Sequence, residues 1–173
     1  MTCLKLTDTE RLLLANQYEI LGRLKNDEQY ELMAQTLRDG HEWLYRQYFD
    51  VLSENLPDEK VEHVLAILGI YGDMRDSFKE LTDKTGLEES KLTFPGFDGN
   101  NECELLSFTE ALRKSRRFEN TIGVTAKNSH MPTTDMYQRM IDEWKALGSP
   151  SYPYSREQIV AIIASRIHPS NRK

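Results

Sequence analysis

Hydrophobic residues recur at helical spacing through most of the chain, most densely between residues 57 and 81. Pro57, Asp58 and Glu59 place a proline and two acidic side chains in the first turn, which favours a helix start. A helix that is apolar all round in its middle is usually the buried centre of a helical domain. We therefore expect the other helices to wrap helix 57–81. Its all-round apolar middle consists of Val64, Leu65, Ala66, Ile67, Leu68 and Ile70.

Three shorter helices are predicted before the central one. The first begins at a capping box, in which Thr7 and Glu10 satisfy free backbone amides, and Gly40 separates the second helix from the third. Because the third helix carries charges of both signs, we favour an ordinary helical hairpin over a DNA-binding helix-turn-helix. The apolar face of the first helix contains Leu12, Leu13, Ile20, Leu21 and Leu24. The predicted bounds are 7–26, 27–38 and 41–53.

The region after the central helix alternates helices with two irregular segments. Residues 94–102 combine two phenylalanines with proline and glycines, and they form either a binding loop or a structural turn whose rings enter the core. Residues 119–133 show no helical period, so this long connection is either functional or mobile. A second capping box, at Ser155 and Gln158, starts the last helix. The three helices predicted here end near residues 118, 148 and 168.

Composition and charge fit one soluble helical domain. The chain has 173 residues, 39% hydrophobic and 29% charged, with a net charge of −6, which disfavours bulk nucleic-acid binding. Its longest apolar run, near Ala66–Ile70, is far short of the ~20 residues that cross a bilayer. Two cysteines and no secretory signal lead us to expect a cytoplasmic protein. The predicted fold is all-α: a single compact domain, residues 1–169, of about seven helices, followed by a basic tail, 170–173.

The residue chemistry favours a non-catalytic protein without a cofactor. No His-Glu-x-x-His motif is present, and Glu59 and His63 are four residues apart rather than the three of a di-iron bundle, so no metal site is predicted. Cys103 begins a helix, where the dipole can activate a thiol, but a buried inert cysteine is the favoured interpretation. The acidic side chains of Asp73, Asp76 and Glu80 are expected to form a solvated face.

Two polar features leave alternatives open. A basic run lies at the end of a helix, where the dipole favours positive charge without any partner, and contact with nucleic acid is the minor alternative. Asn16 and Gln17 interrupt an apolar helix and, if buried, need hydrogen-bond partners from the 94–98 loop, a ligand or a second subunit. The basic run consists of Arg113, Lys114, Arg116 and Arg117.

Three stretches, Arg11–Tyr18, Phe94–Asp98 and Tyr137–Met140, resemble in this order the YfbU family of small bacterial helical proteins. The resemblance covers residues 6–165. It implies a helical fold but supplies no catalytic residues, because no activity is established for the family. Fusion of such a domain to a DNA-binding domain in some members implies ligand binding. The matching positions predicted to bind a ligand are Asn16, Gln17, Tyr18, Phe97, Asp98, Tyr137 and Arg139.

The leading functional hypothesis is a cytoplasmic interaction or regulatory module that acts by protein binding as a homo-oligomer. It rests on aromatic side chains beyond what one buried stripe per helix requires. The alternatives are a small-ligand sensor using the site named above, a nucleic-acid-binding protein, or an unrecognised hydrolase using its carboxylates or Cys103. No membrane partner is expected. The aromatic residues concerned are Trp43, Tyr45, Tyr48, Phe49 and Trp144.

Overall fold

The computed structural model describes residues 5–49 and 52–171 and confirms the all-α class. Within these residues the only extended pairing is one isolated bridge between Phe97 and Asn128. The described α-helices number eight, against about seven predicted. They are α1 (Asp8–Lys25), α2 (Glu28–Arg38), α3 (Glu42–Phe49), α4 (Asp58–Glu80), α5 (Cys103–Lys114), α6 (Glu119–Ile122), α7 (Thr134–Ala146) and α8 (Arg156–Ala164), with 3-10 turns η1 (Glu89–Leu92) and η2 (Pro169–Asn171).

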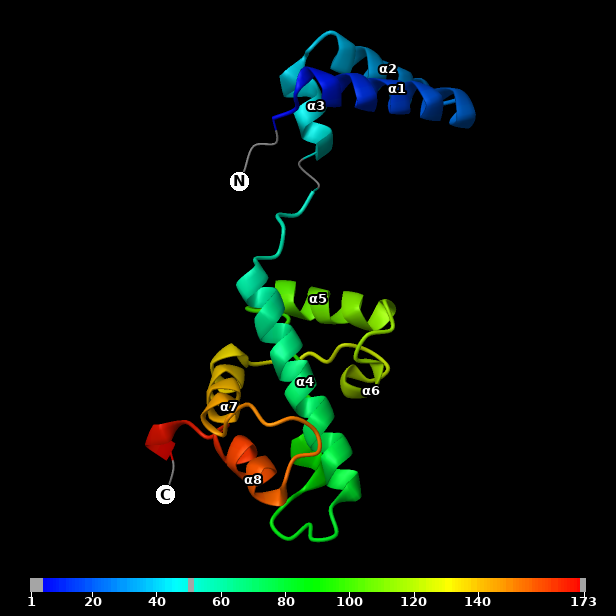
Figure 1. Ribbon diagram of the computed structural model, residues 1–173. Helices are drawn as coiled ribbons and strands as arrows, with labels where there is room; N and C mark the ends of the chain where they lie inside the picture. Colours follow the sequence, from blue (N-terminus) through cyan, green and yellow to red (C-terminus); the bar gives the residue numbers. More distant parts are fainter. Residues whose placement is uncertain (1–4, 50–51, 172–173) are drawn as a thin grey trace. The chain divides into compact units, whose positions relative to one another are not determined.

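The chain forms two compact units, with unit 1 ending at Asn55 and unit 2 beginning at Leu56 (Figure 1). The single domain expected over residues 1–169 stays a prediction. Helices α1, α2 and α3 bury an apolar cluster of their own. The part of the predicted tail that the structure describes, up to residue 171, belongs to η2, and residues 172–173 lie outside the described residues.

Unit 1 is a hairpin of α1 and α2 with α3 packed on α2. The predicted capping box is confirmed, since Thr7 accepts from the Glu10 amide at 3.3 Å and Glu10 accepts from the Thr7 amide at 2.7 Å. The two helices approach closely at Gly22, where a Cβ would lie 2.8 Å from Cγ of Glu31. The buried cluster of the unit consists of Ala15, Met33, Leu37 and Tyr45.

Unit 2 is organised around α4, as predicted. Helices α5, α6, α7 and α8 surround it in Figure 1, and its middle is buried. The last helix begins at the predicted capping box, because the Ser155 hydroxyl accepts from the Gln158 amide and the Gln158 side chain accepts from the Ser155 amide. The side chains of α4 without exposed surface are Val64, Ile67, Leu68, Tyr71 and Met74.

The segment 94–98 is a structural turn with its two phenylalanine rings in the core. Phe94 and Phe97 are buried, and their ring centroids lie 5.6 and 5.3 Å from that of Tyr137. Gly96 has a φ of +95°, and a Cβ there would lie 1.8 Å from the carbonyl oxygen of Lys127. The turn and the 126–129 backbone therefore touch directly, which only glycine permits.

The long connection 119–133 is held by specific contacts. It begins with α6, and its later part is fixed to two other elements. The Ser129 amide donates to the Phe97 carbonyl at 3.1 Å, and the Ala126 amide donates to the Glu110 carboxylate at 3.0 Å. In residues 5–49 and 52–171, no helix combines the length and the apolar character needed to span a membrane.

Candidate functional site

The residues predicted to bind a ligand are divided between the two units. Asn16, Gln17 and Tyr18 belong to unit 1, whereas Phe97, Asp98, Tyr137 and Arg139 belong to unit 2. The prediction of one ligand site formed by both groups therefore stays a prediction.

Within unit 2, these side chains have packing and capping roles. Phe97 and Tyr137 are fully buried, and the Tyr137 hydroxyl donates to the Gly96 carbonyl at 2.6 Å. Asp98, which is 1% exposed, accepts from the Asn100 amide at 3.1 Å. Arg139 donates to the carbonyl oxygens of Ser165 and Arg166 at 3.2 and 2.8 Å, which satisfies backbone acceptors at the end of α8. These contacts account for the residues without a ligand.

The polar residues of α1 are not in the interior. Asn16 and Gln17 are exposed, and Asn16 accepts a hydrogen bond from Arg38 of α2 at 3.2 Å. The hypothesis that the 94–98 loop is the partner of Asn16 joins residues of different units and stays a prediction. Within unit 1, α1 meets α2 through Ala15, Tyr18 and Gly22.

Helix α1 consequently has a second apolar face, which unit 1 does not cover. Leu13, Ile20 and Leu24 are 62%, 57% and 77% exposed, and they follow one another at spacings of seven and four residues. Since Leu13 and Ala15 are two residues apart, they lie on nearly opposite sides of a helix with 3.6 residues per turn. Other large apolar side chains exposed on the same unit are Leu12, Leu32, Trp43, Leu44, Tyr48 and Leu52.

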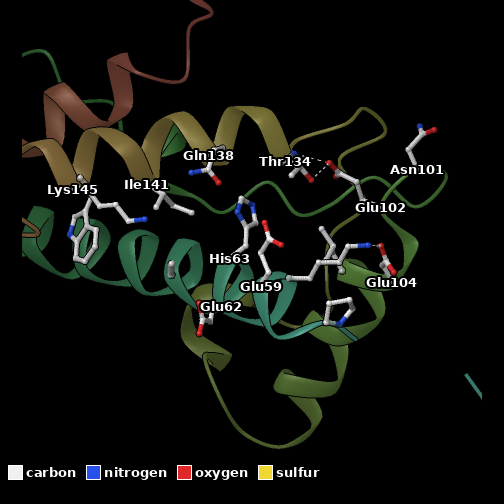
Figure 2. A pocket seen from close by; sticks show the side chains of 15 residues that line it. Glu59, Glu62, His63, Asn101, Glu102, Glu104, Thr134, Gln138, Ile141 and Lys145 are labelled. Carbon is white, nitrogen blue, oxygen red and sulfur yellow. Dashed lines mark hydrogen bonds and ion pairs between the residues drawn. The ribbon is translucent and has the colours of Figure 1, made fainter. Parts of the chain in front are cut away.

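Unit 2 contains a pocket of about 820 Å³ between the first half of α4, the start of α5 and α7 (Figure 2). His63 and Glu59 rise from α4 toward Gln138 on α7, whereas Glu62 points away from them. Apolar surface from Ile141 and other residues of the pocket wall completes the lining. Sequence reasoning considered Glu59 and His63 as metal ligands, rejected that role, and missed the pocket, because Gln138 comes from a helix far along the chain.

Two acidic residues of the pocket wall are already engaged. Glu102 accepts from the Thr133 and Thr134 amides at 2.8 and 2.7 Å and from the Asp98 amide at 2.8 Å. Burial raises the pKa of Glu102, but these hydrogen bonds outweigh it and the net effect lowers the pKa. Glu104 forms an ion pair with Lys60. Glu102 and Glu104 are therefore already satisfied by other residues of unit 2.

His63 is the unusual group of the pocket. Its Nε2 atom is enclosed and has no hydrogen-bond partner among the described residues. Burial lowers the pKa of His63, and the adjacent Gln138 side chain and the charges of Glu102 and Glu59 oppose that effect only in part. Gln138 lies close enough to influence the pKa, although it does not meet the geometry of a hydrogen bond to Nε2. Glu59 and Lys145 form no ion pair within the described parts of the chain, so a small polar molecule could pair with either. Among residues 5–49 and 52–171, no group of three or more His, Cys, Asp or Glu could hold a metal ion.

The other candidate residues are dispersed. Cys103 is exposed, so the expectation of a buried cysteine is wrong: the first turn of α5 directs it to solvent. Arg113 pairs with Glu110 at 2.9 Å at the end of α5. Asp73, Asp76 and Glu80 line one open hollow together with Lys79 and Tyr152. In it, Asp76 pairs with Lys79 at 2.7 Å, the Tyr154 hydroxyl donates to Asp73 at 3.2 Å, and the Tyr152 hydroxyl donates to Glu80. Exposed basic residues near the α5 end are Lys114, Arg116 and Arg117.

The exposed aromatic surface is smaller than predicted. Trp43 and Tyr48 are exposed, as the sequence suggested. Tyr45, by contrast, is buried in the core of unit 1, because it packs against Phe49 with ring centroids 6.4 Å apart. Trp144 is partly buried and donates from Nε1 to the Pro150 carbonyl at 3.0 Å.

Comparison with known proteins identifies the family. The family model of the YfbU domain matches residues 4–165. The chain belongs to the YfbU family. A similar protein, UPF0304 protein MJECS11 of Methanocaldococcus jannaschii, is 31% identical to this chain over 165 residues. The aligned region covers 91% of this chain and 98% of the relative. The YfbU match spans both compact units, so α1–α3 belong to the family's domain as much as the unit around α4 does.

Proposed function

We propose that the chain is a non-catalytic cytoplasmic interaction or regulatory module that binds protein through unit 1 and assembles as a homo-oligomer. The observation that carries the proposal is the apolar surface exposed on α1, α2 and α3. The side chains of Leu24, Leu32 and Trp43 are each more than half exposed to solvent.

Exposed apolar surface of this extent favours association. Soluble monomers rarely present a large contiguous apolar patch, and such patches mark binding surfaces. Complete burial of one leucine or isoleucine side chain is worth about 1.5–3 kcal/mol, so even partial burial of several offsets the entropy lost on association. Aromatic residues such as Trp43 and Tyr48 are typical anchors of protein interfaces.

Native mass spectrometry and sedimentation of the full chain test the proposal. We expect an oligomer at micromolar concentration with no additional bound mass. A monomer over the whole accessible concentration range would contradict self-association, and the apolar surface would then require a different protein partner. Val124→Glu is a control for apolar surface outside unit 1. Val124 is 90% exposed in unit 2, and its substitution should leave the oligomer intact.

A second candidate function is the sensing of a small polar molecule in the pocket beside His63. It is supported by a hollow of about 820 Å³ in which Glu59 and Lys145 have no ion-pair partner among the described residues. A thermal-shift screen with metabolite-sized amines and acids tests it. A compound that binds should raise the Tm of the wild type more than it raises the Tm of Glu59→Gln. The Tm of Glu28→Gln, a variant in unit 1, should rise as much as that of the wild type. A screen in which no compound raises Tm would count against this function.

A further inference from the structure

We infer that the outer face of α1 pairs with the same face of α1 from a second copy of this chain, with the two helices antiparallel. The inference rests on the proposed self-association and specifies its geometry. The contact residues are Leu13, Gln17, Ile20 and Leu24.

The spacing of these four residues is that of a helix–helix seam. The steps from Leu13 to Gln17, Ile20 and Leu24 are four, three and four residues, which match alternating core positions of a heptad repeat. All four side chains are exposed, and they lie opposite the face that packs on α2 through Ala15 and Gly22. A polar residue at one core position, here Gln17, is a known device for fixing register and the number of helices.

A second copy is the occupant that matches this face. A two-fold contact is self-complementary, so the stripe on one copy meets an identical stripe on the other. Unit 2 exposes fewer large apolar side chains in a row. Val124, Met131, Leu147 and Tyr152 come from loops or a helix end, and Val160 on α8 and Ile167 just after it form a row of only two.

The distribution of charge along α1 favours the antiparallel direction. Asp8 and Glu10 lie in the first turn, and Arg23 and Lys25 lie in the last turn. Among the described residues, the exposed side chains of Asp8 and Arg23 make ion pairs only within their own helix, with Arg11 and Glu19. In an antiparallel pair, the acidic first turn of each helix lies beside the basic last turn of the other. The positive end of each helix dipole then also lies beside the negative end of its partner's. Parallel pairing would align like charges.

Disulfide trapping tests both the partner and the direction. The variants Leu13→Cys and Leu24→Cys are each made in a background with Cys3→Ser and Cys103→Ser. Each variant is expressed alone, and the two are also co-expressed with different tags. We expect oxidation to link Leu13→Cys to Leu24→Cys in the co-expressed sample, with much less linked product from either variant alone. Gln29→Cys on the exposed side of α2 is the matched control and should not become linked.

The outcomes separate this inference from the proposed function. Linked product from each single variant alone would indicate parallel helices and overturn the inference. An oligomer that forms no disulfide at residues 13 and 24 would also overturn it, while the proposed self-association would stand. A monomer would remove both.

A charge substitution gives an independent measurement. Since the Ile20 side chain is exposed, Ile20→Glu should leave unit 1 folded by circular dichroism and weaken the dimer at least ~10-fold in its dissociation constant. Val124→Glu should leave the dissociation constant unchanged. Equal dissociation constants for Ile20→Glu and the wild type would contradict the seam.

Discussion

Thr133 donates two hydrogen bonds to Glu102, one from its amide at 2.8 Å and one from its hydroxyl at 2.9 Å. The two residues are 31 positions apart in the chain. The same carboxylate accepts from the amides of Asp98 and Thr134, and only 6% of Glu102 is exposed. One buried side chain therefore joins the 96–102 turn to the first residues of α7, and it sets one wall of the pocket in Figure 2.

Glu102→Gln is expected to destabilise unit 2 strongly. The amide group keeps the shape of the side chain but replaces one acceptor oxygen with a donor, so buried N–H groups of Thr133, Thr134 or Asp98 lose their partner. The expected loss in the free energy of unfolding is about 3 kcal/mol, measured by urea denaturation. Glu104→Gln is the control, because Glu104 takes part in an exposed ion pair with Lys60 and should cost less than about 1 kcal/mol. Equal losses for the two variants would show that Glu102 is not a tie between these segments.

Gly96→Ala and Gly123→Ala should differ although both glycines have positive φ. At Gly123, with φ of +91° and ψ of −158°, no atom lies within 4 Å of an added Cβ, so alanine costs only the backbone strain, on the order of 1–3 kcal/mol. At Gly96 the same strain is joined by overlap with the Lys127 carbonyl, and we expect at least ~3 kcal/mol. Thermal unfolding followed by circular dichroism measures both. A cost at Gly96 no greater than at Gly123 would contradict the close approach.

Tyr137→Phe tests the hydrogen bond from the α7 ring to the 94–98 turn. The variant keeps the aromatic cluster but removes the donor to the Gly96 carbonyl, at 2.6 Å, with an expected loss of about 1–1.5 kcal/mol. Tyr71→Phe is matched, since among the described residues this buried hydroxyl donates only to the sulfur of Met140, at 3.7 Å, and its loss should cost less. Chemical denaturation of both variants gives the comparison. The opposite order would place the more important hydroxyl on α4.

The stability of unit 2 should fall as the pH drops below the ordinary pKa of His63, which is 6.5. Burial lowers the pKa of His63 in the folded chain, so the unfolded chain binds a proton more readily. Stability is therefore full above pH 6.5 and is lost as the pH falls toward the lowered folded pKa. The expected result is a larger decrease in Tm between pH 7.5 and pH 5.5 for the wild type than for His63→Gln. His41→Gln, at an exposed position of unit 1, should behave as the wild type; a wild-type decrease no larger than that of His63→Gln would contradict the effect.

The local sequence predicted the helices of this protein well. Both capping boxes, at Thr7 and Ser155, are present, and the central helix predicted over 57–81 is observed as Asp58–Glu80. These features depend on residues within one or two helical turns of each other. Their hydrogen bonds and periodicity can therefore be read from neighbouring letters. The third helix was expected to reach Ser53. The structure describes it over Glu42–Phe49, residues 50–51 lie outside the described part of the chain, and Ser53 is not helical.

The arrangement of α1 could not be read in the same way. Its large apolar residues suggested the buried face, yet the face that contacts α2 uses Ala15, Tyr18 and Gly22. Small residues allow two helices to approach closely, so the crossing favours them, while hydrophobicity alone does not distinguish a core from an interface. The same limitation made Asn16 and Gln17 look like interior polar groups.

The sequence by itself determined the all-α class, the caps, the central helix and the membership in the YfbU family. Tertiary structure decided the division into two units, the roles of Glu102 and Gly96, the pocket beside His63 and the face of α1 that the rest of unit 1 leaves exposed. The physical reason is the range of the interactions. A helix cap or an apolar stripe is formed by residues that are close in the sequence. The donors of a buried carboxylate, and the burial or exposure of an apolar face, depend instead on how segments far apart in the chain pack together.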